Sequence, residues 1–200
     1  MKIKKFELCL AIAICIIIAG CSANKTSKNL KIDAEEKLVD VIVVLPMENK
    51  TKDEIAPDLI RSKIIEELYF KGYEKLSPDF IDRKLESLEN NEEKENVAKI
   101  DPQVLNDLIG ADGVFYSTLK KSEKSIGFFY APVTISISCE LRKSANGEVI
   151  WKESYSATNR NFAFTRKGLE MKCHKTYEEV IEEVVTKIIE TLPYGPNLRG

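Results

Sequence analysis

The chain has few of the residues from which most active sites are built. Its 200 residues include one histidine, His174, and one tryptophan, Trp151. A zinc site needs about three or four protein ligands, and no further Cys/His cluster accompanies Cys173 and His174. The sequence also lacks a Gly-x-Ser-x-Gly nucleophile motif and a Gly-x-x-x-x-Gly-Lys phosphate loop. We therefore expect no metal, no cofactor and no catalytic residue, and an envelope hydrolase is the least favoured function.

Neither a charge excess nor a long apolar run is present. Lysine and arginine number 30 against 32 acidic residues, a formal net charge of -2. Nothing in that balance attracts nucleic acid. The apolar run 8–19 is about a dozen residues long, whereas a helix needs roughly 20 to cross a bilayer. An uncleaved spanning helix is therefore disfavoured.

The N-terminus has the layout of a secretory signal instead. Lys2, Lys4 and Lys5 precede the apolar run, and small residues follow it. Ile18-Ala19-Gly20-Cys21 resembles the lipobox of bacterial lipoproteins, in which the signal is cut before a cysteine that receives diacylglycerol. The resemblance implies a signal peptide at 1–20 and lipidation, including palmitate, at Cys21. A plain secretory signal or a short anchor is the alternative.

Ser22, which follows the lipobox cysteine, bears on the choice of membrane. Aspartate at this position would indicate retention in the inner membrane under the familiar sorting rule. We therefore expect a lipid anchor in the outer membrane with the protein facing the periplasm. The inner membrane or the cell surface is expected if sorting differs. Residues 21–37 are polar and lysine-rich and are interpreted as a flexible tether, with about fifteen residues reaching at most ~50 Å.

Hydrophobic periodicity predicts one globular domain at 38–193, followed by a tail at 194–200. Apolar and polar residues alternate along 133–142, which is typical of a strand with one face in the core. Asn146-Gly147 is a strong hairpin turn signal. We expect an α/β (α+β) fold in which a single mixed sheet of about five strands, with a C-terminal hairpin, is flanked by about three or four helices. The expected strands are 39–45, 73–76, 113–119, 133–142 and 148–153, the expected helices are 57–71, 78–88, 102–109 and 177–192, and 159–172 is expected to be a long loop.

Two cysteines, Cys139 and Cys173, remain once the signal is removed and Cys21 is lipidated. They could form one disulfide, closing a loop of about 33 residues worth roughly 3–4 kcal/mol in the chain-entropy model. Alternatively, Cys139 is a buried apolar side chain and Cys173 an unrelated thiol. The position of Cys139 on the apolar face of its strand favours the second interpretation.

Three segments of the body resemble a known family. They read VVLPMENKT at 43–51, LIGADGV at 108–114 and LRKSANGEVIW at 141–151. Together they resemble a family of bacterial outer-membrane lipoproteins of unknown function, similar to the wider group that contains the TolB amino-terminal domain, CsgG and LpoB. The resemblance spans roughly residues 39–192. It implies a mixed α/β domain that acts as an envelope adaptor without catalysis, with protein partners that include a CsgG-like lipoprotein.

Our first hypothesis is a non-catalytic adaptor or assembly factor in an envelope complex that is related to secretion, transport or the cell wall. The alternative is a binding lipoprotein for a small solute or a cell-wall fragment. Exposed aromatic residues near 126–132 also make a homodimer a candidate. Aromatic residues in two predicted loops are the candidate interaction surface, and the solute-binding alternative uses them as an aromatic lip: Phe128, Phe129, Tyr130, Phe162 and Phe164.

Overall fold

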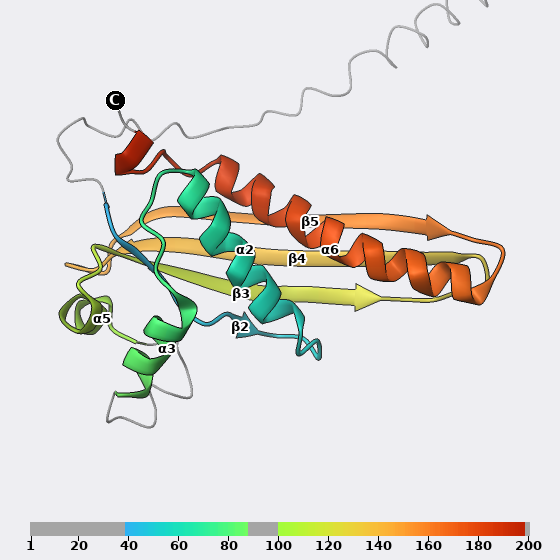
Figure 1. Ribbon diagram of the computed structural model, residues 1–200, viewed down its shortest axis with the longest axis horizontal. Helices are drawn as coiled ribbons and strands as arrows, with labels where there is room; N and C mark the ends of the chain where they lie inside the picture. The colour runs from blue at the N-terminus through green and yellow to red at the C-terminus, as the bar shows by residue number, and fades with distance from the viewer. Residues whose placement is uncertain (1–38, 88–99, 199–200) are drawn as a thin grey trace, which may run out of the picture. The chain divides into compact units, whose positions relative to one another are not determined.

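The computed structural model describes residues 39–87 and 100–198 (Figure 1). The predictions for the signal peptide, for Cys21 and for the tether lie outside these residues. Within the described ranges, no helix combines the length and apolar character needed to cross a bilayer.

A mixed sheet forms the centre of the fold and confirms the predicted class. Its strands are β1 (Ile42–Val44), β2 (Glu48–Asn49), β3 (Gly113–Lys124), β4 (Tyr130–Lys143) and β5 (Val149–Phe162). The order is β1-β3-β4-β5, and β2 pairs with β3 further along the same edge as β1. β1 and β2 run parallel to β3, whereas β3, β4 and β5 are antiparallel hairpin strands.

Four helices are described: α2 (Ala56–Phe70), α3 (Pro78–Glu86), α5 (Pro102–Ile109) and α6 (Arg166–Glu190). The first three have proline in their first two positions, as expected where an N–H would lack a partner. The side chain of Asp101 caps α5, and Gly110 ends it in a left-handed conformation with φ of 77°. A short 3-10 helix, η2 (Pro196–Leu198), follows α6.

Two sequence-based predictions were wrong. Segment 73–76 is not a strand, because the Tyr73 N–H bonds back to the Leu68 carbonyl and its hydroxyl donates to the Pro193 carbonyl. The predicted loop at 159–172 is the end of β5 and the start of α6. Thr165 caps α6 by accepting from the Gly168 N–H. The first turns of α6 bury only a few residues among many polar ones, so the sequence shows little helical periodicity there and the helix was not predicted.

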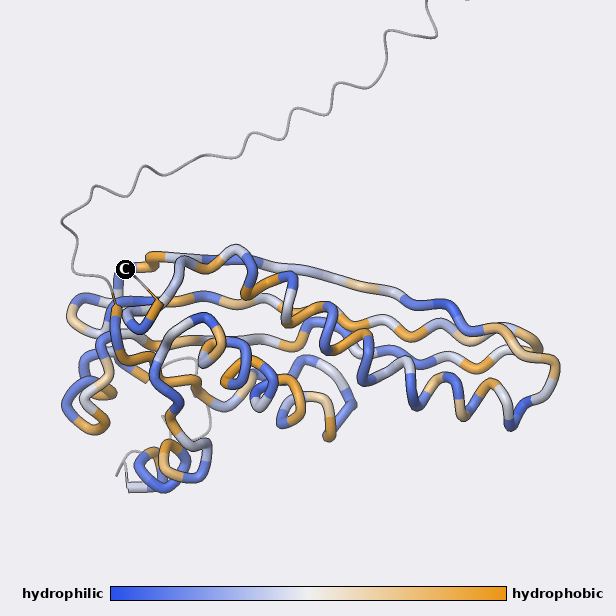
Figure 2. Tube along the Cα trace, turned by 45° about the horizontal axis from the view of Figure 1, so that its top comes forward, coloured by the Kyte–Doolittle hydropathy of each residue, from blue (hydrophilic) through white to orange (hydrophobic). Residues whose placement is uncertain are grey.

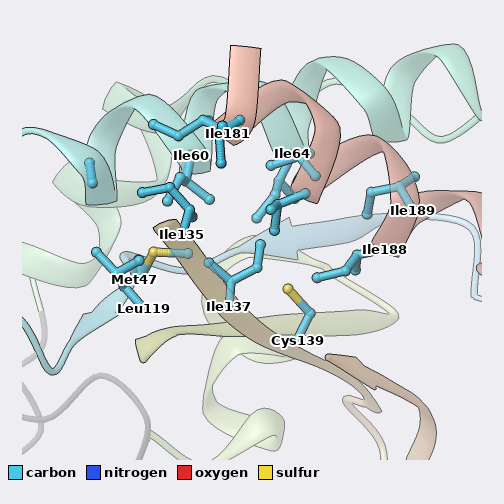
Figure 3. Packing of buried hydrophobic residues seen from close by; sticks show 14 of the residues in the cluster. Met47, Ile60, Ile64, Leu119, Ile135, Ile137, Cys139, Ile181, Ile188 and Ile189 are labelled. Carbon is cyan, nitrogen blue, oxygen red and sulfur yellow. The ribbon is translucent and has the colours of Figure 1, made fainter. Parts of the chain in front are cut away.

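The two faces of the sheet are covered unequally. α2 and α6 pack on one face and form the main core, in which helix side chains meet β4 (Figure 3). The labelled members of this core are Met47, Ile60, Ile64, Leu119, Ile135, Ile137, Cys139, Ile181, Ile188 and Ile189. On the other face, α3 and α5 cover β1 and the start of β3 with a smaller cluster that includes Val43, Leu45, Ile81, Leu105 and Val114.

The long strands have two distinct ends. At the proximal end, residue 39 precedes β1, which pairs with Gly113, Val114 and Phe115. At the distal end are the β3–β4 turn (125–129) and the β5–α6 connection (163–165). β3 has 12 residues, so at about 3.3 Å per residue the two ends lie roughly 40 Å apart. Figure 2 shows apolar colour where the two distal connections meet.

Candidate functional site

The structure brings together all five aromatic residues singled out from the sequence, here called the aromatic tip. Phe128 and Phe129 stack edge to face with centroids 4.9 Å apart. Phe129 lies 6.3 Å from Phe164, and Tyr130 lies 5.1 Å from Phe162. The β3–β4 turn and the β5–α6 connection therefore meet at the distal end, in a group of three phenylalanines beside the Tyr130–Phe162 pair.

This cluster is ordered by the backbone and yet open to solvent. The Ala163 N–H donates to the Phe129 carbonyl at 3.3 Å, and the Gly127 N–H donates to the Tyr130 carbonyl at 2.8 Å. Phe128 is 86% exposed and Phe164 is 95% exposed. Contiguous exposed apolar surface is uncommon on monomers and marks contact sites.

Basic residues are frequent in the two chain segments that carry the aromatic tip. Segments 121–132 and 160–175 contain seven lysines or arginines against two glutamates. Four of these cations contact carboxylates, in the pairs Lys121–Glu123, Lys124–Asp53, Arg166–Glu170 and Lys175–Glu179. Arg160, Lys167 and Lys172 are exposed, and Lys172 Nζ donates to the Phe162 carbonyl at 2.7 Å. The distal end is therefore locally positive although the chain as a whole is slightly negative.

A second cluster, centred on Asp53, was not predicted from the sequence. Asp53 Oδ1 accepts from the backbone N–H groups of Ile55 (3.1 Å) and Ala56 (3.2 Å) at the start of α2. Its Oδ2 accepts from Ser122 Oγ and from the Tyr177 hydroxyl, both at 2.6 Å. The sequence shows an aspartate three residues before a helix, which is a capping signal. It does not show that the partners of this aspartate lie on β3 and α6.

The electrostatics of the Asp53 cluster indicate a structural role, in which an ionised carboxylate links three elements of the fold. Burial raises the pKa of Asp53, but hydrogen bonds from Ser122, Tyr177 and the two backbone N–H groups outweigh it and lower the pKa to about 2. Burial and the Asp53 carboxylate raise the pKa of Tyr177. Lys124 Nζ lies 3.3 Å from the Tyr177 ring centroid. Since Ser122 donates its proton to a carboxylate that stays ionised, the arrangement ties α2, β3 and α6 together.

Of the two interpretations of the cysteines, the disulfide is not formed: Cys139 and Cys173 are both free and buried. Cys173 Sγ lies 4.0 Å from the Ala131 carbonyl. Ala131 and Cys139 are eight positions apart on the same strand, which is about 26 Å at 3.3 Å per residue. A disulfide requires Cα atoms within about 7 Å. Burial raises the pKa of the Cys139 thiol to about 12 and also raises that of Cys173.

His174 is exposed on α6. Across residues 39–87 and 100–198, no group of three or more His, Cys, Asp or Glu side chains is placed to hold a metal ion. Trp151 stacks on Phe115 with centroids 5.7 Å apart and donates from Nε1 to Thr191 Oγ1.

A third feature is the outward face of β4 and β5 together with the free edge of β5, here called the open sheet surface. Hydroxyl residues face each other in the pairs Thr134–Thr158, Ser136–Ser156 and Ser138–Ser154. β5 is the last strand in the sheet order, so among the described residues it pairs only with β4. Ser154, Ser156 and Thr158 are exposed. The polar half of the alternation seen in the sequence therefore remains uncovered.

The chain is similar to several solved structures. The lipoprotein GNA1162 from Neisseria meningitidis is 20% identical with a TM-score of 0.55, and the alignment covers 70% of this chain and 97% of that one. A PelC dodecamer from Paraburkholderia phytofirmans is 15% identical, with a TM-score of 0.49 and coverage of 77% and 89%. The LpoB C-terminal domain from Salmonella enterica is 16% identical, with a TM-score of 0.44 and coverage of 59% and 82%.

No curated protein sequence matches the chain significantly. The family described as "Putative lipoprotein GNA1162-like" matches residues 34–193, which is most of the chain and the whole of the predicted globular body. The match confirms the lipoprotein resemblance drawn from the three segments, and the chain belongs to the GNA1162-like lipoprotein family.

Proposed function

We propose that this chain is a lipid-anchored, periplasm-facing lipoprotein of the cell envelope that acts as a non-catalytic adaptor or assembly factor. The observation that carries the proposal is the open sheet surface, which presents a long free edge and a flat hydroxyl-rich face. Membership of a lipoprotein family supports the anchor. Cys21, with Ser22 after it, is the proposed acylation site in the outer membrane.

The free edge of β5 is suited to a protein partner. Natural edge strands are usually short, or protected by lysine, proline or a bulge, because an unpaired edge invites another strand. β5 has 14 residues, and its central segment 154–159 contains no charged residue and no proline. Backbone N–H and C=O groups on such an edge can bind an extended segment by strand addition, and side-chain contacts on the adjoining face supply selectivity.

The Asp53 cluster supports the non-catalytic part of the proposal. It combines an ionised carboxylate with a serine and a tyrosine, which invites comparison with an active site. A nucleophilic serine needs a neighbouring base that takes its proton. Ser122 instead donates to Asp53, whose pKa is lowered to about 2, so this carboxylate is a poor base at neutral pH. Its four hydrogen bonds are explained by helix capping and by joining three elements.

A solute-binding role is less well supported than an adaptor role. Small-molecule sites are concave and bury most of the ligand. The depression beside α2 is lined by Lys52, Asp53, Glu54, Ile55, Ser122 and Lys124. It contains none of the aromatic residues expected to stack on a ligand.

Site-specific photocrosslinking in cells tests the adaptor proposal. A photoreactive residue at Ser156, exposed on β5, should capture one defined envelope protein or a second copy of the chain. The matched control is Glu183, which is exposed on α6, the helix that packs on the opposite face of the sheet. Equal capture at both positions, or none at Ser156, contradicts the proposal.

The anchor is tested separately. The parent chain should incorporate labelled palmitate and sediment with the outer membrane, whereas Cys21→Ser should do neither. A parent chain that takes up no label contradicts the proposed lipidation, and labelled protein in the inner membrane contradicts the proposed sorting.

A further inference from the structure

The aromatic tip differs from the open sheet surface in chemistry and needs its own explanation. Phe128 and Phe164 protrude from two adjacent connections and are almost fully exposed. Each connection is fixed by backbone hydrogen bonds, and Thr165 caps the helix that follows. The backbone that carries the phenylalanines is therefore ordered while their side chains point to solvent, and they are not part of either buried cluster.

Charge identifies the kind of surface that would meet this tip. Three exposed cations, Arg160, Lys167 and Lys172, are not taken up by the four carboxylate pairs around the tip. Along α6 the sign changes, because segment 176–190 contains five glutamates and one lysine. Positive charge is thus concentrated at the end of the helix that adjoins the aromatic residues.

We infer that the aromatic tip is a second membrane contact, which places Phe128, Phe129 and Phe164 among the headgroups of an anionic phospholipid bilayer. Aromatic side chains favour the membrane–water interface. Basic residues beside the aromatic side chains are attracted to anionic lipids, and salt weakens this attraction. A protruding aromatic cluster with exposed cations on the adjoining ends of β5 and α6 matches a soft, negatively charged surface better than it matches a protein groove, which would need a complementary cavity of fixed shape.

The site is distinct from the proposed acyl anchor. The tip lies at the far end of the long strands from residue 39, where the chain enters the body. The 21–37 segment has 17 residues and could span at most ~60 Å when extended, which is longer than the roughly 40 Å of the strands. Docking at the tip is therefore compatible with an anchor at Cys21, but it does not depend on acylation.

Depth-dependent fluorescence quenching tests the inference on the full chain reconstituted in vesicles. Phe128→Trp reports on the tip, and Phe70→Trp, at an exposed position at the end of α2, is the matched control. Vesicles contain brominated acyl chains in phosphatidylcholine, with or without phosphatidylglycerol. Trp151 is common to all samples, and the parent signal is subtracted.

We expect Phe128→Trp to be quenched in vesicles with phosphatidylglycerol and at least about threefold less in phosphatidylcholine alone. High salt should reduce the quenching, and Phe70→Trp should not be quenched in either vesicle. No quenching of Phe128→Trp in the anionic vesicles overturns the inference. Equal quenching at positions 70 and 128 also overturns it, because the body would then lie on the bilayer without using the tip.

Two charge reversals on α6 test whether docking depends on charge near the tip or on the net charge of the whole chain. Lys167→Glu should lower the quenching of Phe128→Trp several-fold, whereas Lys187→Glu, the same change in the acidic half of the helix, should leave it nearly unchanged. Equal effects of the two reversals contradict a local site. If Phe128→Ser with Phe164→Ser keeps vesicle docking but loses a crosslinked envelope protein, the tip is a protein interface and the membrane inference is wrong.

Discussion

The proximal and distal halves of the same three strands are built in different ways. In the proximal half, β1 and β2 extend the sheet, helices cover both faces near β1, and Phe115 is fully buried. In the distal half, β3, β4 and β5 continue without β1 or β2, and Phe128 at their turn is 86% exposed. The same long strands are therefore covered by helices on both faces at the proximal end and on one face at the distal end.

This difference shows that the helices, rather than the strands, decide which parts of the sheet are buried. The β4 alternation is continuous from Val133 to Leu141 and its apolar side is buried throughout, because α6 is long enough to cover it. The opposite side is covered only where α3 and α5 reach. We expect stability to reside in the proximal half and binding in the distal half, where local changes cost the fold little.

The largest effect is expected from truncating a phenylalanine in the proximal core. Phe115→Ala should lower the free energy of unfolding by about 3–5 kcal/mol, because a large cavity opens beneath Trp151. Phe128→Ala is the matched change at the distal end and should stay within about 0.5 kcal/mol. Urea denaturation of both variants measures the contrast. Similar losses for the two would show that the tip contributes to the core.

Much of the fold was predictable from local patterns. The alternation along β4, the Asn146-Gly147 turn and the prolines that begin α2, α3 and α5 are signals within a few residues of one another. The start of α6 was missed because its first turns place few apolar residues on the sheet. Segment 73–76 was wrongly predicted to be a strand: its apolar residues are buried without strand pairing, because Tyr73 contacts the chain end at Pro193 and Leu76 packs against the smaller core cluster.

The candidate site was predictable only in part. Five aromatic residues in two predicted connections were singled out by type, and the hairpin and α6 then brought them together. The Asp53 cluster was not found because Asp53 is 69 residues from Ser122 and 124 residues from Tyr177. The open edge of β5 depends on sheet order, which short-range patterns do not determine.

The second effect concerns an ion pair that holds the proximal half. Arg61 on α2 donates to the Val44 carbonyl and to both oxygens of Asp82 on α3; its side chain is 6% exposed and that of Asp82 is 43% exposed. Asp82→Ala strands a buried guanidinium, so we expect a loss of about 2–3 kcal/mol. Glu66→Ala, which breaks the exposed pair with Lys63, should cost less than about 0.5 kcal/mol. Equal losses in thermal unfolding would show that burial of Arg61 does not matter.

The third effect lies at the boundary between the halves and depends on pH. The pKa of Asp53 falls from 3.8 to about 2 on folding, which corresponds to about 2 kcal/mol of stability. Because the folded pKa is the lower one, this stability is present above about pH 4 and is lost as the pH falls through about 2. Asp53→Asn should remove it at neutral pH.

Unfolding measured between pH 2 and pH 6 provides the check on Asp53. The parent protein should lose stability more steeply than Asp53→Asn on acidification, and the two curves should converge near the lowest pH. Parallel curves would mean that Asp53 acts through shape alone. The variant Glu54→Gln, next to Asp53 but exposed, is the control and should follow the parent.

The smallest effects compare one thiol from each half. Cys139 lies among isoleucines of the proximal core, where Figure 3 shows its sulfur near Ile188. A serine hydroxyl there would be withdrawn from water, and its neighbouring polar group would be the hydroxyl of Ser117, which lies opposite on β3 and is buried without a hydrogen-bond partner. We expect Cys139→Ser to cost about 1–2 kcal/mol. Cys173 instead lies beside the Asn161 amide and the Ala131 carbonyl, which a serine hydroxyl can also contact. Cys173→Ser should therefore cost less than about 1 kcal/mol, as measured by urea unfolding under reducing conditions. The reverse order would mean that the distal half is packed as tightly as the proximal half, and the contrast between them would fail.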